Sequence, residues 1–105
     1  MAGKVVWAES AWNDLQQTTD FIARDSPRYA AAFAGEVLEA AQSLARFAER
    51  GRVVPEFRNP TIRELFVRNY RLIYQVEMNS TNILAFIHGS RDLAGLWERE
   101  THRRP

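Results

Sequence analysis

The most informative segment of the sequence is "NYRLIYQVEMNSTNILAFIHGSRDL", residues 69–93. Two apolar runs, residues 70–77 and 82–88, flank a short polar segment, which is the pattern of two strands joined by a turn. The second run ends on the polar cluster "HGSRD" at residues 88–92. Such a cluster could be an active site, an edge that binds a partner, or the way in which a buried strand leaves the core.

Side chains alternate between the two faces of a strand, so parity predicts which side chains of residues 70–77 face the core. The expected core face carries Tyr70, Leu72, Tyr74 and Val76. The expected open face carries Arg71, Ile73, Gln75 and Glu77. In residues 82–88 both faces are apolar, which is typical of a central strand. There His88 shares a face with Leu84 and Phe86, while Ile83, Ala85 and Ile87 share the other.

The N-terminal part of the chain predicts a strand followed by two helices. Lys4–Trp7 is a short β-branched and aromatic run, typical of a strand. Ser10 is expected to cap a helix that ends near Arg24, and Ser26 followed by Pro27 is expected to begin a second helix. That helix has an apolar stripe of Ala30, Phe33, Ala34, Val37, Ala41 and Leu44. The short connection predicts an antiparallel helical hairpin.

Residues 49–60 hold one glycine and two prolines among charges and predict a loop. Ile62–Val67 is a further strand, and a tight turn at Arg68 and Asn69 follows it, with Asn69 expected to take a positive φ. The order is therefore β-α-α-β-β-β. We expect an α+β fold in which the helical hairpin packs on one face of a small, mostly antiparallel sheet. The other face is left for solvent, a partner or a substrate.

Length and composition limit the classes of protein to which this chain can belong. The chain has 105 residues, 46% of them hydrophobic and 26% charged, which suits one folded domain over residues 1–105 with a core at about 4–93 and a short basic tail. The net charge is +1, so composition neither requires nor excludes a nucleic-acid partner. There are no cysteines, and no apolar run approaches the ~18–20 residues of a membrane span. We expect a cytoplasmic protein.

Motifs for the commonest enzyme chemistries are absent from the sequence. It has no His-x-x-x-His pair, no glycine-rich phosphate loop and no G-x-S-x-G elbow, so we expect neither a metal nor another cofactor. What is left is metal-free acid–base chemistry on the open face of the sheet. Arg71 and Arg91 could each hold a phosphate, and His88 could transfer a proton. Glu64 or Glu56 could act as the base.

Each of these residues also has a structural interpretation. His88 could be the hydrogen-bonded end of a strand, and Arg91 could form a turn clasp with the neighbouring aspartate. Glu64 is expected to be a surface charge, whereas Arg71 could face solvent or a partner's carboxylate. These alternatives stay open on the residues alone.

The helices suggest a binding module instead of an enzyme. A helical hairpin beside free sheet edges is a natural docking place for an amphipathic helix or an extended peptide. Tyr29 and Phe47 are candidate aromatic anchors for such a partner, and Arg71 and Arg91 are candidate charged contacts. Trp12 is expected in the core.

Taken in order, these segments resemble the RelE/ParE superfamily, the toxins of bacterial type II toxin–antitoxin modules. The similarity covers roughly residues 5–93. "WAESAWNDLQQTTDFIARDSP" resembles the family's first helix, "GRVVPEFRNPTIREL" its loop and second strand, and "NYRLIYQV" its third strand. The most specific piece is "ILAFIHGSRDL", which resembles the closing strand and turn.

The superfamily includes two activities. Its RelE branch cleaves mRNA on the ribosome without a metal, using lysines and arginines with a tyrosine or histidine near the C-terminus, and its ParE branch poisons DNA gyrase. By resemblance, Arg71 and Arg91 match two arginines of the ribonuclease branch. Ile62 and Glu64 stand where that branch has lysines, and Trp97 stands where it has a tyrosine. Tryptophan has no phenolic proton to give.

The resemblance therefore implies a ParE-like toxin, associated with growth arrest and plasmid stabilization, that inhibits DNA gyrase and is neutralised by a cognate antitoxin. An acidic antitoxin segment would pair with Arg71, Arg91 or the basic tail. The alternative is a RelE-like endoribonuclease acting with the ribosome on mRNA, in which Arg71, Arg91, His88 and Glu64 would carry the chemistry. A third possibility is a relative that binds an antitoxin but has lost its toxicity.

Overall fold

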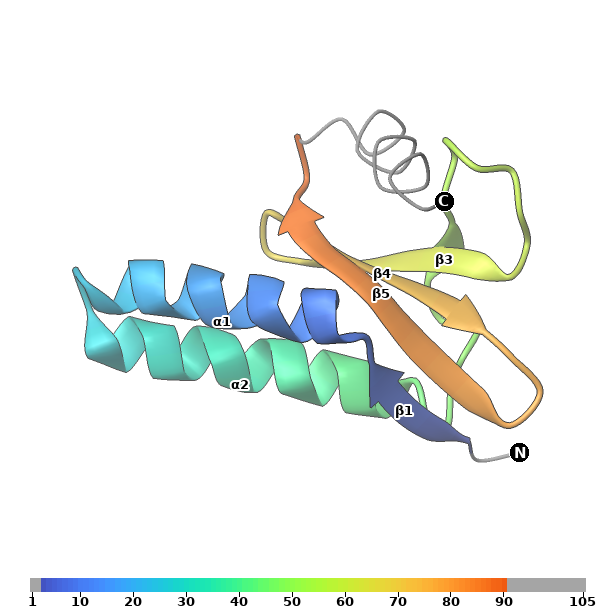
Figure 1. Ribbon diagram of the computed structural model, residues 1–105, viewed down its shortest axis with the longest axis horizontal. Coiled ribbons are helices and arrows are strands. Elements are labelled where there is room, and N and C mark those ends of the chain that lie inside the picture. Colours follow the sequence, from blue (N-terminus) through green and yellow to red (C-terminus); the bar gives the residue numbers. More distant parts are fainter. Residues whose placement is uncertain (1–2, 91–105) are drawn as a thin grey trace.

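The computed structural model describes residues 3–90 (Figure 1). Its elements are β1 (Lys4–Trp7), α1 (Glu9–Ala23), α2 (Pro27–Ser43), β2 (Arg52–Val53), β3 (Ile62–Val67), β4 (Tyr70–Val76) and β5 (Ser80–His88). The predictions for Arg91 and Trp97 lie outside the described residues.

The strands form one five-stranded sheet in the order β1-β5-β4-β3-β2. β1 runs parallel to β5, and the other three neighbouring pairs are antiparallel. The predicted α+β fold is confirmed. The sheet has one strand more than predicted, because the two-residue β2 pairs with Arg63 and Glu64 inside the segment expected to be a loop. Two residues are too few to show an alternation, so only the pairing reveals this strand.

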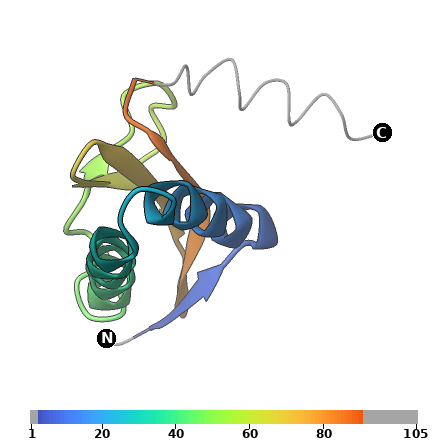
Figure 2. The ribbon, with the colours of Figure 1, turned by 90° about the vertical axis from the view of Figure 1, so that its left-hand side faces the viewer.

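The helices form a hairpin on one face of the sheet, and Figures 1 and 2 both show them side by side. Ser26 caps α2 as predicted, since its Oγ accepts a hydrogen bond from the Tyr29 N–H at 3.1 Å. The predicted cap at Ser10 is wrong. Ala8 still donates its N–H to the carbonyl of Ile83 at 2.9 Å, so the chain passes from β1 directly into α1 and Ser10 already lies in the first turn.

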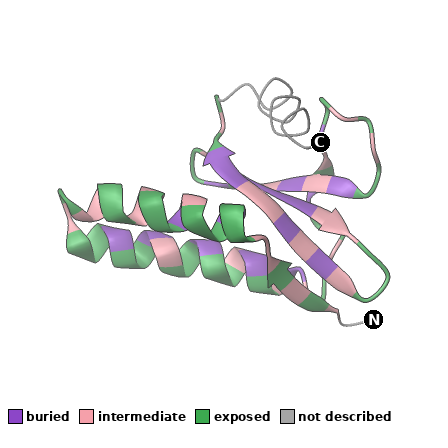
Figure 3. Ribbon diagram, viewed as in Figure 1, coloured by how far each residue is buried: buried purple, intermediate pink, exposed green. Residues whose placement is uncertain are grey.

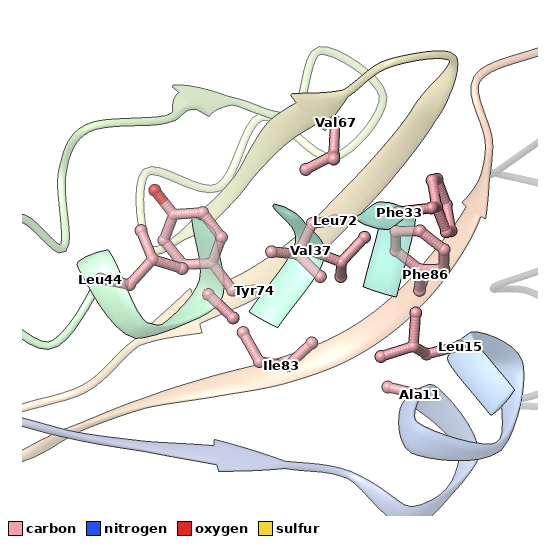
Figure 4. Packing of buried hydrophobic residues seen from close by; sticks show 11 residues of the cluster. Ala11, Leu15, Phe33, Val37, Leu44, Val67, Leu72, Tyr74, Ile83 and Phe86 are labelled. Atoms are coloured by element: carbon pink, nitrogen blue, oxygen red, sulfur yellow. The ribbon is translucent and has the colours of Figure 1, made fainter. Parts of the chain in front are cut away.

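The main core lies between the helices and the sheet. It is made of Ala11, Leu15, Phe33, Val37, Ala41, Leu44, Val67, Leu72, Tyr74, Ile83 and Phe86 (Figure 4). The predicted core face of β4 is confirmed, because Tyr70 and Val76 pack against this cluster beside the two buried β4 residues. The predicted stripe of α2 is confirmed as well, except that Ala34 is only half-buried.

The opposite face of the sheet is less open than predicted. A second, smaller cluster of Val54, Ile62, Ile73 and Ile87 lies there, with Phe57 and Ala85 packed against it. Val54 and Phe57 come from the segment between β2 and β3, which therefore covers part of the face that no helix covers. Figure 3 shows buried residues on the sheet strands as well as on the helices. Within residues 3–90, neither helix is long and apolar enough to cross a membrane.

A β-bulge in β5 changes which residues face the helices. The register between β4 and β5 shifts by one residue, and Leu84 is the extra residue on β5. Ile83 before the bulge and Phe86 after it therefore belong to the same cluster, on the helix side. The predicted grouping of Ile83 with Ile87 is wrong, because Ile87 belongs to the second cluster.

The turn between β3 and β4 also differs from the prediction. Arg68, and not Asn69, takes the positive φ, at 55°, and Arg58 in the preceding segment has a φ of 53°. The guanidinium of Arg68 is held by Glu36 of α2 and lies 5.2 Å from the ring centre of Tyr29. These contacts help to offset the cost of a left-handed conformation at a residue with a Cβ.

Candidate functional site

Two of the sequence-predicted site residues, Glu64 and Arg71, lie together on the face of the sheet opposite the helices. In the β3–β4 ladder Glu64 pairs with Ile73 and Arg71 pairs with Phe66, so the two charged residues are diagonal neighbours. Nε and Nη2 of Arg71 both lie 2.6 Å from Oε1 of Glu64. The Glu64 side chain is fully buried and that of Arg71 is 6% exposed, so this ion pair is shielded from water.

Glu56, from the segment between β2 and β3, binds the other side of the same guanidinium. Nη1 of Arg71 donates to Oε2 of Glu56 and Nη2 donates to Oε1, both at 3.0 Å. Two parallel bonds of this kind form the fork geometry in which arginine binds carboxylates most strongly. All three nitrogens of Arg71 are therefore held by carboxylates.

A second arginine completes the group. Nε of Arg52 lies 2.6 Å from Oε2 of Glu64, while the Arg52 side chain is 60% exposed. Its guanidinium also lies 5.4 Å from the ring centre of Phe66, a cation–π contact. We call Arg52, Glu56, Glu64 and Arg71 the Arg–Glu cluster.

The Arg–Glu cluster balances two positive charges with two negative ones. The hydrogen bonds from Arg71 hold the pKa of Glu56 below its usual range, and those from Glu56 raise the pKa of Arg71 further. Both groups therefore stay charged at neutral pH, and neither is poised to exchange a proton there. The cluster is a closed electrostatic unit with little positive charge left for an anion.

The interpretation of Glu64 as a surface charge is wrong. Its carboxylate is buried because two arginines compensate it, which is the condition under which a charge can be placed in a protein interior. The pairing of Glu64 with Arg71 could have been predicted from the hairpin pattern of the sequence. A tight turn at residues 68–69 sets the β3–β4 register, and that register places Glu64 diagonally across from Arg71.

His88 lies away from the Arg–Glu cluster, at the exposed end of β5. Its ring contacts Tyr70 edge-on at 5.4 Å, on the side of the sheet that faces the helices. Nδ1 accepts the Ser90 N–H at 3.2 Å and lies 2.8 Å from the Ser90 Oγ. The structure does not bring His88 together with Arg71 or Glu64, and this local bonding agrees with the interpretation of His88 as the end of a strand.

The candidate anchors for a partner lie near the two ends of α2. Tyr29 is 42% exposed and Phe47 is 63% exposed. A shallow groove runs between α2 and β3, lined by Glu36, Glu39, Ala40, Ser43, Arg50, Phe66, Val67 and Arg68. Because β2 pairs only with Arg63 and Glu64, the rest of β3 has no neighbouring strand on this side within residues 3–90. The described part of the chain therefore has both exposed aromatic rings and an open sheet edge.

Residues 5–93 match the model of the ParE toxin of the type II toxin–antitoxin system parDE. The chain belongs to this ParE toxin family. Toxin RelE2 of Caulobacter vibrioides is 36% identical over 89 residues, which are 84% of this chain and 97% of that protein.

Two solved structures have the same fold. One, described as the chromosomal ParDE system from P. aeruginosa, is 20% identical with a TM-score of 0.68 and covers 83% of this chain and 96% of that chain. The other, the toxin–antitoxin complex RelBE2 from Mycobacterium tuberculosis, is 25% identical with a TM-score of 0.59 and covers 84% and 99%. The resemblance to RelE/ParE toxins is confirmed, and this ParE-family chain is a toxin of the type II class.

Proposed function

We propose that this ParE-family toxin arrests growth by binding and inhibiting DNA gyrase in the cytoplasm, and that a cognate antitoxin neutralises it. The observation that supports this proposal is that the guanidinium of Arg71 is fully paired with carboxylates. The arginine that matches the ribonuclease branch is buried and held by the carboxylates of Glu56 and Glu64. A toxin that acts by binding needs no free cation at this position.

The Arg–Glu cluster argues against ribonuclease chemistry on physical grounds. Cleavage of a phosphodiester needs positive charge where negative charge develops, and losing a single donor of this kind costs about 10²–10³ in rate. By the resemblance to the ribonuclease branch, Ile62 and Glu64 of β3 stand where that branch has lysines, and Glu64 neutralises Arg71 directly. His88 lies on the other side of the sheet, so it has no access to a phosphate bound at Arg71.

The family match also supports a ParE-like toxin, whereas the name of one relative favours the ribonuclease. The family that matches residues 5–93 is described as a ParE toxin. The relative at 36% identity is described as Toxin RelE2, and this name favours the second candidate, a ribosome-dependent mRNA endoribonuclease. That function would require Glu56 to release Arg71 before a phosphate could bind.

The antitoxin is the partner that the surface supports best. A related structure is described as a toxin–antitoxin complex. The α2–β3 groove offers an open strand edge together with the exposed ring of Phe66, and such an edge takes up an extended peptide through main-chain hydrogen bonds. We expect Tyr29 and Phe47 to contact a helical part of the antitoxin, which would become ordered on binding.

The test is a gyrase supercoiling assay with purified toxin, run with and without a stoichiometric amount of antitoxin. Loss of supercoiling together with trapped cleaved DNA, both reversed by antitoxin, is the expected result. Primer extension on mRNA from translating cells is run in parallel. New ribosome-dependent cuts with gyrase unaffected would assign the ribonuclease function instead. Antitoxin binding without growth arrest would identify a toxin that has lost its activity.

A further inference from the structure

β1 forms one edge of the sheet, and its outer side has no neighbouring strand in the part of the chain that the structure describes (Figure 1). The N–H groups of Lys4 and Ala8 both donate to carbonyls on the β5 side. Main-chain groups of successive residues point to opposite sides of a strand, so those of Val5 and Trp7 point away from β5. Among residues 3–90, each of these two residues therefore presents an N–H donor and a carbonyl acceptor without a main-chain partner at the edge.

Apolar side chains lie on both sides of this edge. On the helix side, Trp7 packs against the main core, and its ring meets that of Trp12 edge-on at 5.4 Å. Trp12, for which the sequence predicts a core position, is 39% exposed, and Val6 on the opposite face is 43% exposed. An unpaired strand edge bordered by exposed apolar side chains is a template for pairing with another strand.

A second copy of this chain fits the edge in one antiparallel register. With a two-fold axis perpendicular to the sheet, Val6 lies opposite Val6 of the second copy, and Val5 lies opposite Trp7 of that copy. Every outward main-chain group of Val5 and Trp7 then has a partner. A register shifted by two residues would pair Trp7 with Gly3, whose N–H already donates to the carbonyl of Ala45 at 2.8 Å. A shift in the other direction would pair Val5 with the first residue of α1, which is helical.

The same register brings opposite charges together. Lys4 lies opposite Ala8 of the second copy and therefore beside Glu9 of that copy, and both charged side chains are exposed. The two-fold axis creates this contact twice, whereas a parallel pairing would place Lys4 beside Lys4. A lysine on an edge strand often prevents pairing, but in this register it has an acidic neighbour. Charge complementarity therefore selects a second copy of this chain as the occupant of the edge.

We propose that β1 is a homodimer interface, at which two copies of this chain join their sheets through an antiparallel pairing of β1 with β1. A four-residue strand makes a small interface, so we expect a dissociation constant on the order of 10 μM. β1 and β3 lie toward opposite edges of the sheet, so the dimer leaves the α2–β3 groove of each copy accessible. The proposal does not depend on the cellular target of the toxin, and its failure leaves the proposed function unchanged.

The first test uses the absence of cysteine from the chain. Val6→Cys introduces one thiol, and the proposed register places its Cα about 4.5 Å from the Cα of the same residue in the second copy. A disulfide spans this separation, so we expect Val6→Cys to form a covalent dimer under mild oxidation, detected by non-reducing electrophoresis. Phe21→Cys is the matched control, because Phe21 is 65% exposed but lies near the other end of α1, and this variant should stay monomeric.

The second test is sedimentation velocity over a series of concentrations. Val6→Lys and Val6→Glu should each weaken dimerisation of the chain at least about tenfold, because the axis places like charges face to face. An equimolar mixture of these two variants should restore the dimer, since the introduced charges then attract each other.

A wild-type chain that remains monomeric at about 1 mM overturns the proposal. So does a Val6→Cys chain that forms the disulfide no faster than Phe21→Cys, or a dimer that is unchanged in either charged variant. A monomeric Val6→Cys chain whose thiol is protected from alkylation only by added antitoxin would also overturn it and would assign the edge to the antitoxin.

Discussion

Two arginine–glutamate forks flank the β3–β4 hairpin, and they share their chemistry but not their surroundings. Arg68 in the turn bonds Glu36 of α2 at 3.1 and 2.6 Å, with both side chains nearly half exposed. Arg71 in β4 bonds Glu56 and the fully buried Glu64 at 2.6–3.0 Å. Removing one partner of an exposed ion pair changes the free energy of unfolding little, because water solvates the charge that remains. Removing one partner of a buried pair leaves an uncompensated charge in the interior.

The largest effect should follow from breaking the buried ion pair between Arg71 and Glu64. Glu64→Gln removes the charge that compensates Arg71 and Arg52, and we expect the free energy of unfolding to fall by about 3–5 kcal/mol. Glu36→Gln removes the same group from the exposed fork and should leave stability almost unchanged. Urea unfolding of the two variants measures the difference. Equal losses in both would show that burial does not separate the two forks.

Two glycines extend the comparison to the backbone. A Cβ on Gly51 would lie 2.4 Å from the carbonyl oxygen of Glu64 and 2.6 Å from the hydroxyl of Tyr74, whereas a Cβ on Gly35 would meet nothing within 4 Å. We expect Gly51→Ala to destabilise the protein by about 1–3 kcal/mol through overpacking. Gly35→Ala should stabilise the exposed side of α2 by about 0.5–1 kcal/mol. Thermal unfolding reports both, and a destabilised Gly35→Ala would contradict this description of α2.

Replacing either of two serines near the starts of the helices should likewise have different effects on stability. The Oγ of Ser26 caps α2, so Ser26→Ala should cost about 1 kcal/mol. No side-chain cap is made at the start of α1, where Ser10 is exposed inside the first turn, so Ser10→Ala should change little. Chemical unfolding of each variant provides the check. A larger loss for Ser10→Ala would restore the cap that the sequence predicted.

The smallest expected effect is the response of Glu56 to acid. Its pKa is lowered in the folded state by Arg71, so its contribution is fully present above the ordinary carboxyl pKa and is lost as pH falls through the lowered value. Glu56→Gln should therefore flatten the loss of stability in acid. Unfolding curves at a series of acidic pH values measure this, and parallel profiles for the wild type and the variant would argue against the fork in solution.

Much of the fold could be predicted because its signals are local. The apolar stripe of α2, the cap at Ser26 and the alternation along β4 each lie within one element, and all three are observed. The misses come from neighbours far away in sequence. β2 is a strand only because it pairs with β3. The bulge at Leu84 lies where the register between β4 and β5 shifts by one residue.

The candidate site shows the same division. Residue types marked Arg71 and Glu64 as candidates, but their meaning depended on what lay beside them. Glu56 could be matched to Arg71 only once the segment between β2 and β3 had folded over the sheet. For that reason a catalytic interpretation looked open in the sequence, and in the structure the same residues form a neutral, closed cluster.

The amino-acid sequence alone predicts the order of the main elements, the core faces of α2 and β4, and the toxin family, because periodicity and ordered motifs are properties of consecutive residues. The burial of Glu64 and the binding of Arg71 by two carboxylates are visible only in the folded structure. The physical reason is that burial and ion pairing depend on distances across the sheet, and a charge acquires its role from the groups that remain when water has been excluded.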